Sequence, residues 1–256
     1  MVSFLEYIGA KIVDAIEEGG RIMIFLWEAI LWAFRPPFRL RNVVKQMEMV
    51  GVNSLLVVTI TATFTGMVLA LQSYNGFRRF GAETLVGTVV ALSMTRELGP
   101  VLTALMVTGR AGSFMAAELG TMRVTEQIDA LTTMAVNPVQ YLIVPRILAG
   151  IVMLPSLTVI ADVLGMIGGY LVGVELLGIN SATYIRRTFD YLELEDIYNG
   201  LIKATFFGFL LSLIGCYKGY HAKGGAEGVG RATTSSVVLA CTLILIFDYF
   251  LTALLF

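Results

Sequence analysis

Long apolar segments alternate with shorter polar segments along the chain. A transmembrane α-helix needs about 20 consecutive, mostly apolar residues, and about five segments reach or approach that length. They cover residues 50–71, 85–108, 141–174, 200–217 and 234–256. The pattern predicts an all-α integral membrane protein that crosses the bilayer about five times.

The beginning of the chain has a different pattern. Within residues 4–18, apolar side chains at helical spacing oppose charged ones, which is typical of an amphipathic helix on a membrane surface or against a partner. Residues 22–34 are apolar but too few to span a bilayer, and they hold both tryptophans, which favour the membrane interface. We expect residues 1–46 to form an amphipathic, interfacial elbow region and residues 47–256 to form the transmembrane domain.

Composition supports a membrane protein and excludes some functions. Hydrophobic residues make up 57% of the chain and charged residues 14%, against roughly 25% charged in a soluble domain. The net charge of −1 argues against nucleic-acid binding, which needs a basic surface. The first residues lack a basic segment and a cleavage site, so no cleavable signal peptide is expected. Both cysteines lie in apolar segments, which favours buried thiols over a disulfide.

Lys and Arg residues are distributed unequally among the loops. If the N-terminus is cytoplasmic, most of them face the cytoplasm, as the positive-inside rule requires. These are Arg35, Arg39, Arg41, Lys45, Arg110, Arg123, Arg146, Lys218, Lys223 and Arg231. Only Arg78, Arg79, Arg186 and Arg187 would then lie outside. The distribution predicts a multi-pass protein with a cytoplasmic N-terminus and a C-terminus on the opposite side.

Arg96, Glu97 and Lys203 are charged side chains that lie within the apolar segments. Arg96 and Glu97 fall near the middle of the second one, where a charge costs at least about 2.5–3.5 kcal/mol on insertion scales. Adjacent residues point about 100° apart on a helix, so each needs a partner on another helix or a wet cavity. Interhelical ion pairs and a polar path for substrate both stay open. Lys203, early in the fourth segment, either snorkels to the outer interface or serves the same path.

Residues 125–138 predict a short helix on the cytoplasmic side. Thr125 can cap its start, Glu126 and Asp129 suit the positive end of the helix dipole, and an Asn-Pro pair stops it. Its pattern alone fits equally well a helix that only connects two spans.

The sequence contains few candidates for chemistry of its own. The glycine-rich residues 218–231 lack the GxxxxGK[ST] pattern, so they predict a flexible or tightly turned loop rather than a P-loop. His221 is the only histidine, which excludes HExxH and Ser-His-Asp sites. Asp162 and Asp248 lie in apolar segments, where helix packing or a proton site is favoured over an aspartyl dyad. No metal site, cofactor or catalytic residue is predicted.

Several long motifs resemble those of the MlaE family, the permeases of ABC transporters that move phospholipids between the two membranes of Gram-negative bacteria and related organelles. The motifs occur in order within residues 40–256 and read ALSMTRELGPVLTALMVTGRAGSFMAAELGTMRVTEQIDAL, MAVNPVQYLIVPR and GAEGVGRATTSSVV. The resemblance implies an inner-membrane permease that works as a homodimer, with two cytoplasmic P-loop ATPase subunits that use the ATP. It also implies a periplasmic ring of MCE-domain lipid-binding protein.

The resemblance assigns roles to two groups of residues. Arg96 and Glu97, in the RELGP motif, would lie by a lipid cavity at the dimer interface, and Lys203 would lie near it. The cytoplasmic helix would dock in the ATPase through Glu126, Gln127, Ile128, Asp129 and Leu131.

Two further expectations follow from the sequence. Glycines at spacings of three to four in the third segment would let helices approach closely, as in a dimer of such chains: Gly165, Gly168, Gly169 and Gly173. The alternative function is an intramembrane enzyme or ion-coupled carrier that uses Asp162, Asp248, Arg96 and Glu97 without ATP.

Overall fold

The computed structural model describes residues 2–37 and 39–255, and within them the side chains of all but residues 2–8 and 15. Its described part is helical and contains no strand. The main α-helices are α1 (Val2–Ala33), α2 (Leu40–Val50), α3 (Leu55–Phe77), α4 (Val86–Ser93), α5 (Gly99–Val107), α6 (Ser113–Val124), α7 (Gln127–Thr133), α8 (Val144–Tyr170), α9 (Ser181–Tyr191), α10 (Leu194–Tyr220) and α11 (Gly225–Leu255). Four π-helical segments continue them: η4 (Met94–Leu98), η5 (Thr108–Gly112), η6 (Val139–Ile143) and η7 (Leu171–Leu176).

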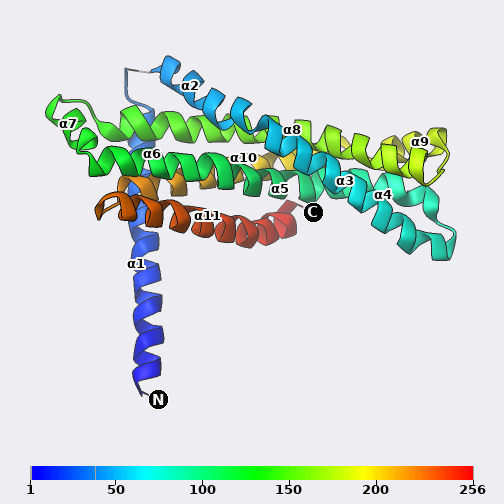
Figure 1. Cartoon of the computed structure of the whole chain (residues 1–256), viewed down its shortest axis with the longest axis horizontal. Coiled ribbons are helices and arrows are strands. Elements are labelled where there is room, and N and C mark those ends of the chain that lie inside the picture. The colour runs from blue at the N-terminus through cyan, green and yellow to red at the C-terminus, as the bar shows by residue number, and fades with distance from the viewer. Residues whose placement is uncertain (1, 38, 256) are drawn as a thin grey trace.

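Five helical segments of the described chain are long and apolar enough to cross a membrane, which confirms the predicted fold class. They are Leu40–Phe80, Glu83–Val124, Val139–Leu176, Leu194–Tyr220 and Gly225–Leu255. In Figure 1 these segments lie along one direction, with α7 at one end of the bundle and α9 at the other. We call these the α7 end and the α9 end.

The second span continues well beyond its predicted end at residue 108. Its helix runs to Val124 through η5, so the polar residues after 108 belong to the span's own helix rather than to a separating stretch. Arg110 explains why a charge is tolerated here: its Nη1 donates to the carbonyl of Met49 (3.0 Å) and to Ser54 Oγ (3.1 Å). A span of 42 residues is also longer than a bilayer requires, so part of it projects into water, where polar residues carry no penalty.

The predicted glycine-rich loop is mostly helix. Only residues 221–224 separate α10 from α11, which begins at Gly225. Gly224 and Gly225 have φ values of +94° and +68°, and this left-handed conformation turns the chain within a few residues. The remaining glycines enter the first turns of α11, so the prediction of a tight turn is right only for its first part.

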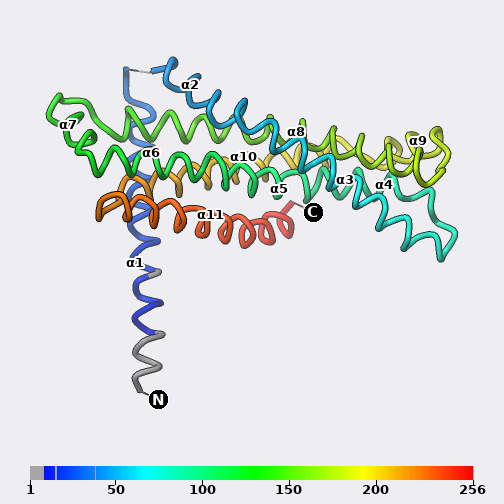
Figure 2. Tube along the Cα trace, in the orientation of Figure 1, coloured from blue at the N-terminus to red at the C-terminus, as the bar shows by residue number. Residues whose placement is uncertain are grey.

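The N-terminal region forms one helix instead of an amphipathic helix followed by an elbow. α1 runs from Val2 to Ala33, at a steep angle to the five spans, as an interfacial helix would lie (Figures 1 and 2). Phe25 and Ala29 are buried against the bundle, and the Phe25 ring packs 5.7 Å from that of Tyr217. The predicted apolar contacts of residues 4–8 lie outside the described side chains.

Glycines let the central helices pack with their backbones in contact. A Cβ atom on Gly66 of α3 would lie 1.9 Å from the carbonyl oxygen of Gly165 in α8, and one on Gly208 would lie 2.2 Å from that of Gly150. Gly168 likewise faces Thr63, and Gly169 and Gly173 face Tyr184. The four glycines thus allow close helix approach as expected, but they do so between helices of one chain, and the dimer stays a prediction.

We predict that Gly66→Ala destabilises the protein by about 1–3 kcal/mol, because the new methyl group overlaps backbone that cannot swing aside. Gly76→Ala is the matched control on the same helix, since nothing lies within 4 Å of its Cβ position. Thermal unfolding in detergent should show a lower midpoint for Gly66→Ala only. Equal midpoints for both variants would contradict the close contact.

Candidate functional site

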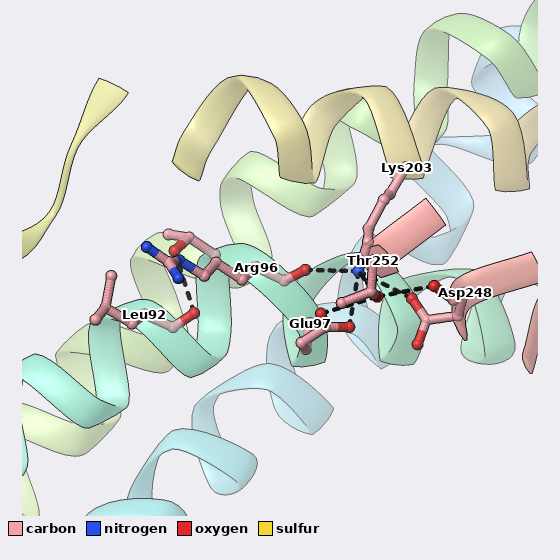
Figure 3. A network of polar contacts seen from close by, with 7 residues as sticks. Leu92, Arg96, Glu97, Lys203, Asp248 and Thr252 are labelled. Atoms are coloured by element: carbon pink, nitrogen blue, oxygen red, sulfur yellow. Dashed lines mark hydrogen bonds and ion pairs between the residues drawn. The ribbon is translucent and has the colours of Figure 1, made fainter. Parts of the chain in front are cut away.

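A buried lysine holds three of the spans together. Lys203 on α10 is 0% exposed, so it does not snorkel to the interface. Its Nζ lies 2.7 Å from Glu97 Oε2, 3.1 Å from Asp248 Oδ1, 2.7 Å from Thr252 Oγ1 and 3.1 Å from the carbonyl oxygen of Arg96. Figure 3 shows Lys203 reaching from α10 toward these groups on η4 and α11. We call Lys203, Glu97, Asp248 and Thr252 the Lys203 cluster.

The local sequence explains one of these contacts. In an α-helix the carbonyl of Arg96 would accept a hydrogen bond from the N–H of residue 100, but proline has none. The ammonium of Lys203 supplies a donor to that carbonyl at 3.1 Å. The helix is also π-helical from Met94 to Leu98, which is common at functional sites. Pro100 thus leaves the Arg96 carbonyl without its helical donor, and this carbonyl in turn accepts a hydrogen bond from the buried Lys203 ammonium.

Thr252 links the Glu97 carboxylate and the Lys203 ammonium to the backbone of α11. Its hydroxyl lies 3.0 Å from Glu97 Oε1 and 2.8 Å from the carbonyl oxygen of Asp248, one turn earlier on α11. A buried ion pair is stable only when such additional hydrogen bonds satisfy the remaining atoms. The cluster therefore fixes the position of α11 relative to η4 and α10.

Arg96 and Glu97 have different partners, as their 100° separation on the helix requires. Arg96 Nη2 lies 2.7 Å from Asp196 Oδ1, and the Asp196 side chain is only 4% exposed. Asp196 also accepts from the backbone N–H of Glu193 and so caps the start of α10. The three predicted site residues therefore lie together, and interhelical ion pairs account for both arginine and glutamate.

Arg96 and Glu97 are not fully enclosed by their ion pairs, because both side chains reach the surface. Arg96 is 40% and Glu97 37% exposed. A groove of about 450 Å³ runs along α3 beside Thr61, Phe64, Thr65, Val68, Leu69 and Gln72, and reaches Leu98, the residue after Glu97. A guanidinium can form paired hydrogen bonds with a phosphate, and an apolar groove suits hydrocarbon. The arrangement can accommodate an amphipathic molecule.

Sequence reasoning missed three partners of this site. Asp196 was treated as part of a polar loop and Thr252 was not considered, although Asp248 and Thr252 stand four residues apart and so share one helix face. Asp248 was considered only together with Asp162. The structure separates those two: Asp248 bonds Lys203, while Asp162 lies against Gly99, where a Cβ atom would come 1.8 Å from its Oδ1. No described contact pairs them as a dyad.

The α7 helix presents the other group of predicted residues. Glu126, Gln127 and Asp129 are exposed, Leu131 is half-buried, and Ile128 is 1% exposed and packs in the core. Ile128 therefore anchors α7 rather than offering contact surface.

The start of α7 also differs from the prediction, because Glu126 rather than Thr125 occupies the cap position, with φ +59°. The Thr125 hydroxyl instead donates to the carbonyl of Thr121 in the preceding helix.

Arg123 connects α7 to the spans. Its Nη1 lies 2.7 Å from Asp129 Oδ1, and its guanidinium carbon lies 5.8 Å from the centre of the Tyr220 ring at the end of α10. A cation over an aromatic ring is attracted by the ring's π-electrons. A movement of α7 can therefore act, through Arg123, on the end of the second span and on the end of the α10 span.

Proteins similar to this chain are described as permeases. The family model described as Permease MlaE matches residues 43–254. The chain is 50% identical to a "Probable ABC transporter permease protein" of Rickettsia bellii over 100% of this chain and 99% of the relative. It is 40% identical to the "Intermembrane phospholipid transport system permease protein MlaE" of Haemophilus influenzae, over 100% and 98%. It is 38% identical to the chloroplastic "Protein TRIGALACTOSYLDIACYLGLYCEROL 1" of Arabidopsis thaliana, over 94% and 69%. With its five spans, its charged cluster and this match over most of its length, the chain belongs to the MlaE permease family.

Proposed function

We propose that this chain is the permease subunit of an ABC transporter that moves phospholipids between the inner and outer membranes, driven by a separate ATPase. Membership of the MlaE permease family supports this, as does the name of the Haemophilus relative. The observation that carries the proposal is that Arg96 and Glu97, adjacent charged residues within a membrane span, both stay partly exposed, while the apolar groove on α3 reaches the next residue, Leu98. A phospholipid needs both a polar contact for its phosphate and an apolar surface for its tails.

The permease would work as a homodimer. In the 18-residue apolar stretch of each span, the buried share is only 11% for the α11 span and 28% for the α2–α3 span. For the α10 span it is 72%. These two outer spans therefore leave large apolar faces for lipid or for a second copy. A single chain offers only an open groove to a two-tailed lipid, whereas two copies related by a two-fold axis can enclose one.

The ATP would be used by a partner, with no cofactor and no catalytic site in this chain. A cytoplasmic P-loop ATPase would dock on the exposed side of α7, through Glu126, Gln127 and Asp129, with Leu131 at the edge and Ile128 holding the helix from below. The Arg123–Asp129 pair would relay movement of the ATPase to the spans.

The chain would lie in the bacterial inner membrane with its α7 end in the cytoplasm. The basic residues at 35–45 and at 123, 146, 218, 223 and 231 gather toward that end, as the positive-inside rule favours. The N-terminus would then be cytoplasmic, and a periplasmic MCE-domain protein would receive or deliver lipid at the α9 end.

We predict that Arg96→Gln and Glu97→Gln lower lipid transfer by about tenfold or more, because a hydrogen bond to a charged group contributes about 1.5–3 kcal/mol. Glutamine keeps the side chain polar, so Lys203 retains an acceptor at position 97. Transfer would be measured between vesicles with the reconstituted transporter, together with the lipid that copurifies with each variant.

The matched controls are Arg21→Gln and Glu17→Gln, which break an ion pair on α1 whose side chains are 58% and 62% exposed. They should leave transfer unchanged. If Arg96→Gln and Glu97→Gln only reduce the amount of folded protein, with full transfer per remaining molecule, the pair is structural and the assignment to lipid is wrong.

We predict that Glu126→Lys weakens binding of the ATPase on the order of tenfold, because it places a like charge or an unpaired one at a charge-complementary contact. Glu126 is exposed, so the bundle itself should fold normally. Glu227→Lys, an equally exposed reversal at the same end on α11, is the control. Pull-down of the ATPase and its stimulated ATP hydrolysis would be measured, and full binding by Glu126→Lys would refute the docking role of this residue.

A further inference from the structure

A polar pocket lies at the α7 end, away from the Lys203 cluster. It has a volume of about 150 Å³ and opens between α2, α6 and the start of α8. Its polar lining consists of Asn42, Lys45 and Gln46 from α2, Glu118 from α6, and Tyr141 and Arg146 from the third span. We call it the α2 pocket. Neither Arg96, Glu97 nor the docking surface of α7 contributes to it.

Arg146 lines the α2 pocket as a buried side chain, and one of its hydrogen-bond donors is unused. Arg146 is 3% exposed; its Nη1 donates to the carbonyl of Leu142 (2.6 Å) and its Nη2 to Glu118 Oε2 (2.5 Å). Its Nε is buried and has no hydrogen-bond partner among the described residues. A buried donor without a partner is costly and calls for a ligand that completes it.

An acceptor without a partner lies in the same pocket. Gln46 Oε1 is buried and makes no hydrogen bond within the described part of the chain. Glu118 is 37% exposed, and only its Oε2 is used by Arg146. The pocket thus offers an unused acceptor and a partly open carboxylate beside an unused donor.

Cations complete the rim of the pocket. Lys45 is exposed and has no ion pair with any described residue, and the Arg39 guanidinium lies over the Tyr141 ring at 4.6 Å. Leu40 and Val44, one turn apart on α2, are exposed and apolar, whereas the other exposed side chains of this helix, Arg41, Lys45 and Glu48, are charged. The pocket therefore opens at a polar edge that adjoins a surface suited to hydrocarbon.

From this arrangement we infer that the α2 pocket binds the headgroup of a membrane phospholipid that carries a primary ammonium group. The phosphate would lie between Lys45 and Arg146 Nε, and the ammonium would donate to Gln46 Oε1 and Glu118. An anionic headgroup with hydroxyl groups could donate to Gln46 Oε1 but would bring no positive charge to the partly open Glu118 carboxylate, so the pocket favours a zwitterionic one. A volume of about 150 Å³ admits a headgroup but not the tails, which would remain along α2 in the bilayer.

Bound there, the lipid would be a fixed part of the permease rather than its cargo. It would join α2 to α6 and α8 at the end of the bundle where α7 projects. The inference does not depend on which molecule the transporter moves.

The test is a lipid titration of delipidated protein in detergent, followed by native mass spectrometry. Dioleoyl-phosphatidylethanolamine, dioleoyl-phosphatidylglycerol and inorganic phosphate would serve as separate probes. We expect phosphatidylethanolamine to form the tightest adduct, and Gln46→Leu and Lys45→Gln to weaken it about fivefold each, as the loss of one hydrogen bond does. Arg41→Gln removes an exposed cation from the same helix outside the pocket and should leave the adduct unchanged.

Glu97→Gln separates this site from the proposed transport site, because Gln46→Leu and Lys45→Gln should weaken phosphatidylethanolamine binding by the same factor with or without Glu97→Gln, whatever that change does to lipid at the transport site. Equal binding by Gln46→Leu, Lys45→Gln and Arg41→Gln would overturn the inference. It would also be overturned if phosphatidylglycerol binds as tightly as phosphatidylethanolamine, or if inorganic phosphate alone displaces the lipid. Arg146 itself is left intact, since its removal would strand Glu118 and endanger folding.

Discussion

The ammonium group of Lys203 is the constraint on which the arrangement of the spans depends. A lysine that is 0% exposed inside a membrane bundle has no route to water, so its charge must be compensated where it lies. Glu97 and Asp248 provide that compensation from two other helices. Because α11 otherwise buries little of its apolar surface, this contact is the main polar determinant of its position.

The same constraint connects structure to transport. Pro100 and the π-helical turn at Met94–Leu98 interrupt the regular helix where Lys203 enters, and the same turn carries the partly exposed Arg96 and Glu97 as well as Leu98, which the α3 groove reaches. Ionic groups that are paired on one side and exposed on the other can exchange one partner for a lipid phosphate without leaving a charge stranded. At the far end, Arg123 connects α7 to the spans through Asp129 and Tyr220. Charged contacts thus join the spans at the Lys203 cluster and at α7, while glycine contacts bring the backbones of α3, α8 and α10 together.

The sequence predicted the number and order of the spans because apolar length is a local property. It underestimated their extent, since a helix that leaves the bilayer continues through polar residues such as Arg110, whose partners Met49 and Ser54 belong to another span. It also identified Arg96, Glu97 and Lys203 as a group, but through resemblance rather than geometry. Which carboxylate pairs with which cation depends on how α10 and α11 rotate against η4. No single-sequence pattern encodes that rotation, so Asp196 and Thr252 could not be found in advance.

The most direct test of this account is a stability comparison of Lys203→Met with a triple variant that adds Glu97→Gln and Asp248→Asn. If the carboxylates exist to compensate a buried ammonium, Lys203→Met alone should lower the free energy of unfolding strongly, by about 3–5 kcal/mol, because it strands two negative charges. The triple variant should recover much of that loss, since no uncompensated charge remains. If the triple variant is as unstable as the sum of the single changes, the charges are not coupled and the Lys203 cluster does not hold the spans together.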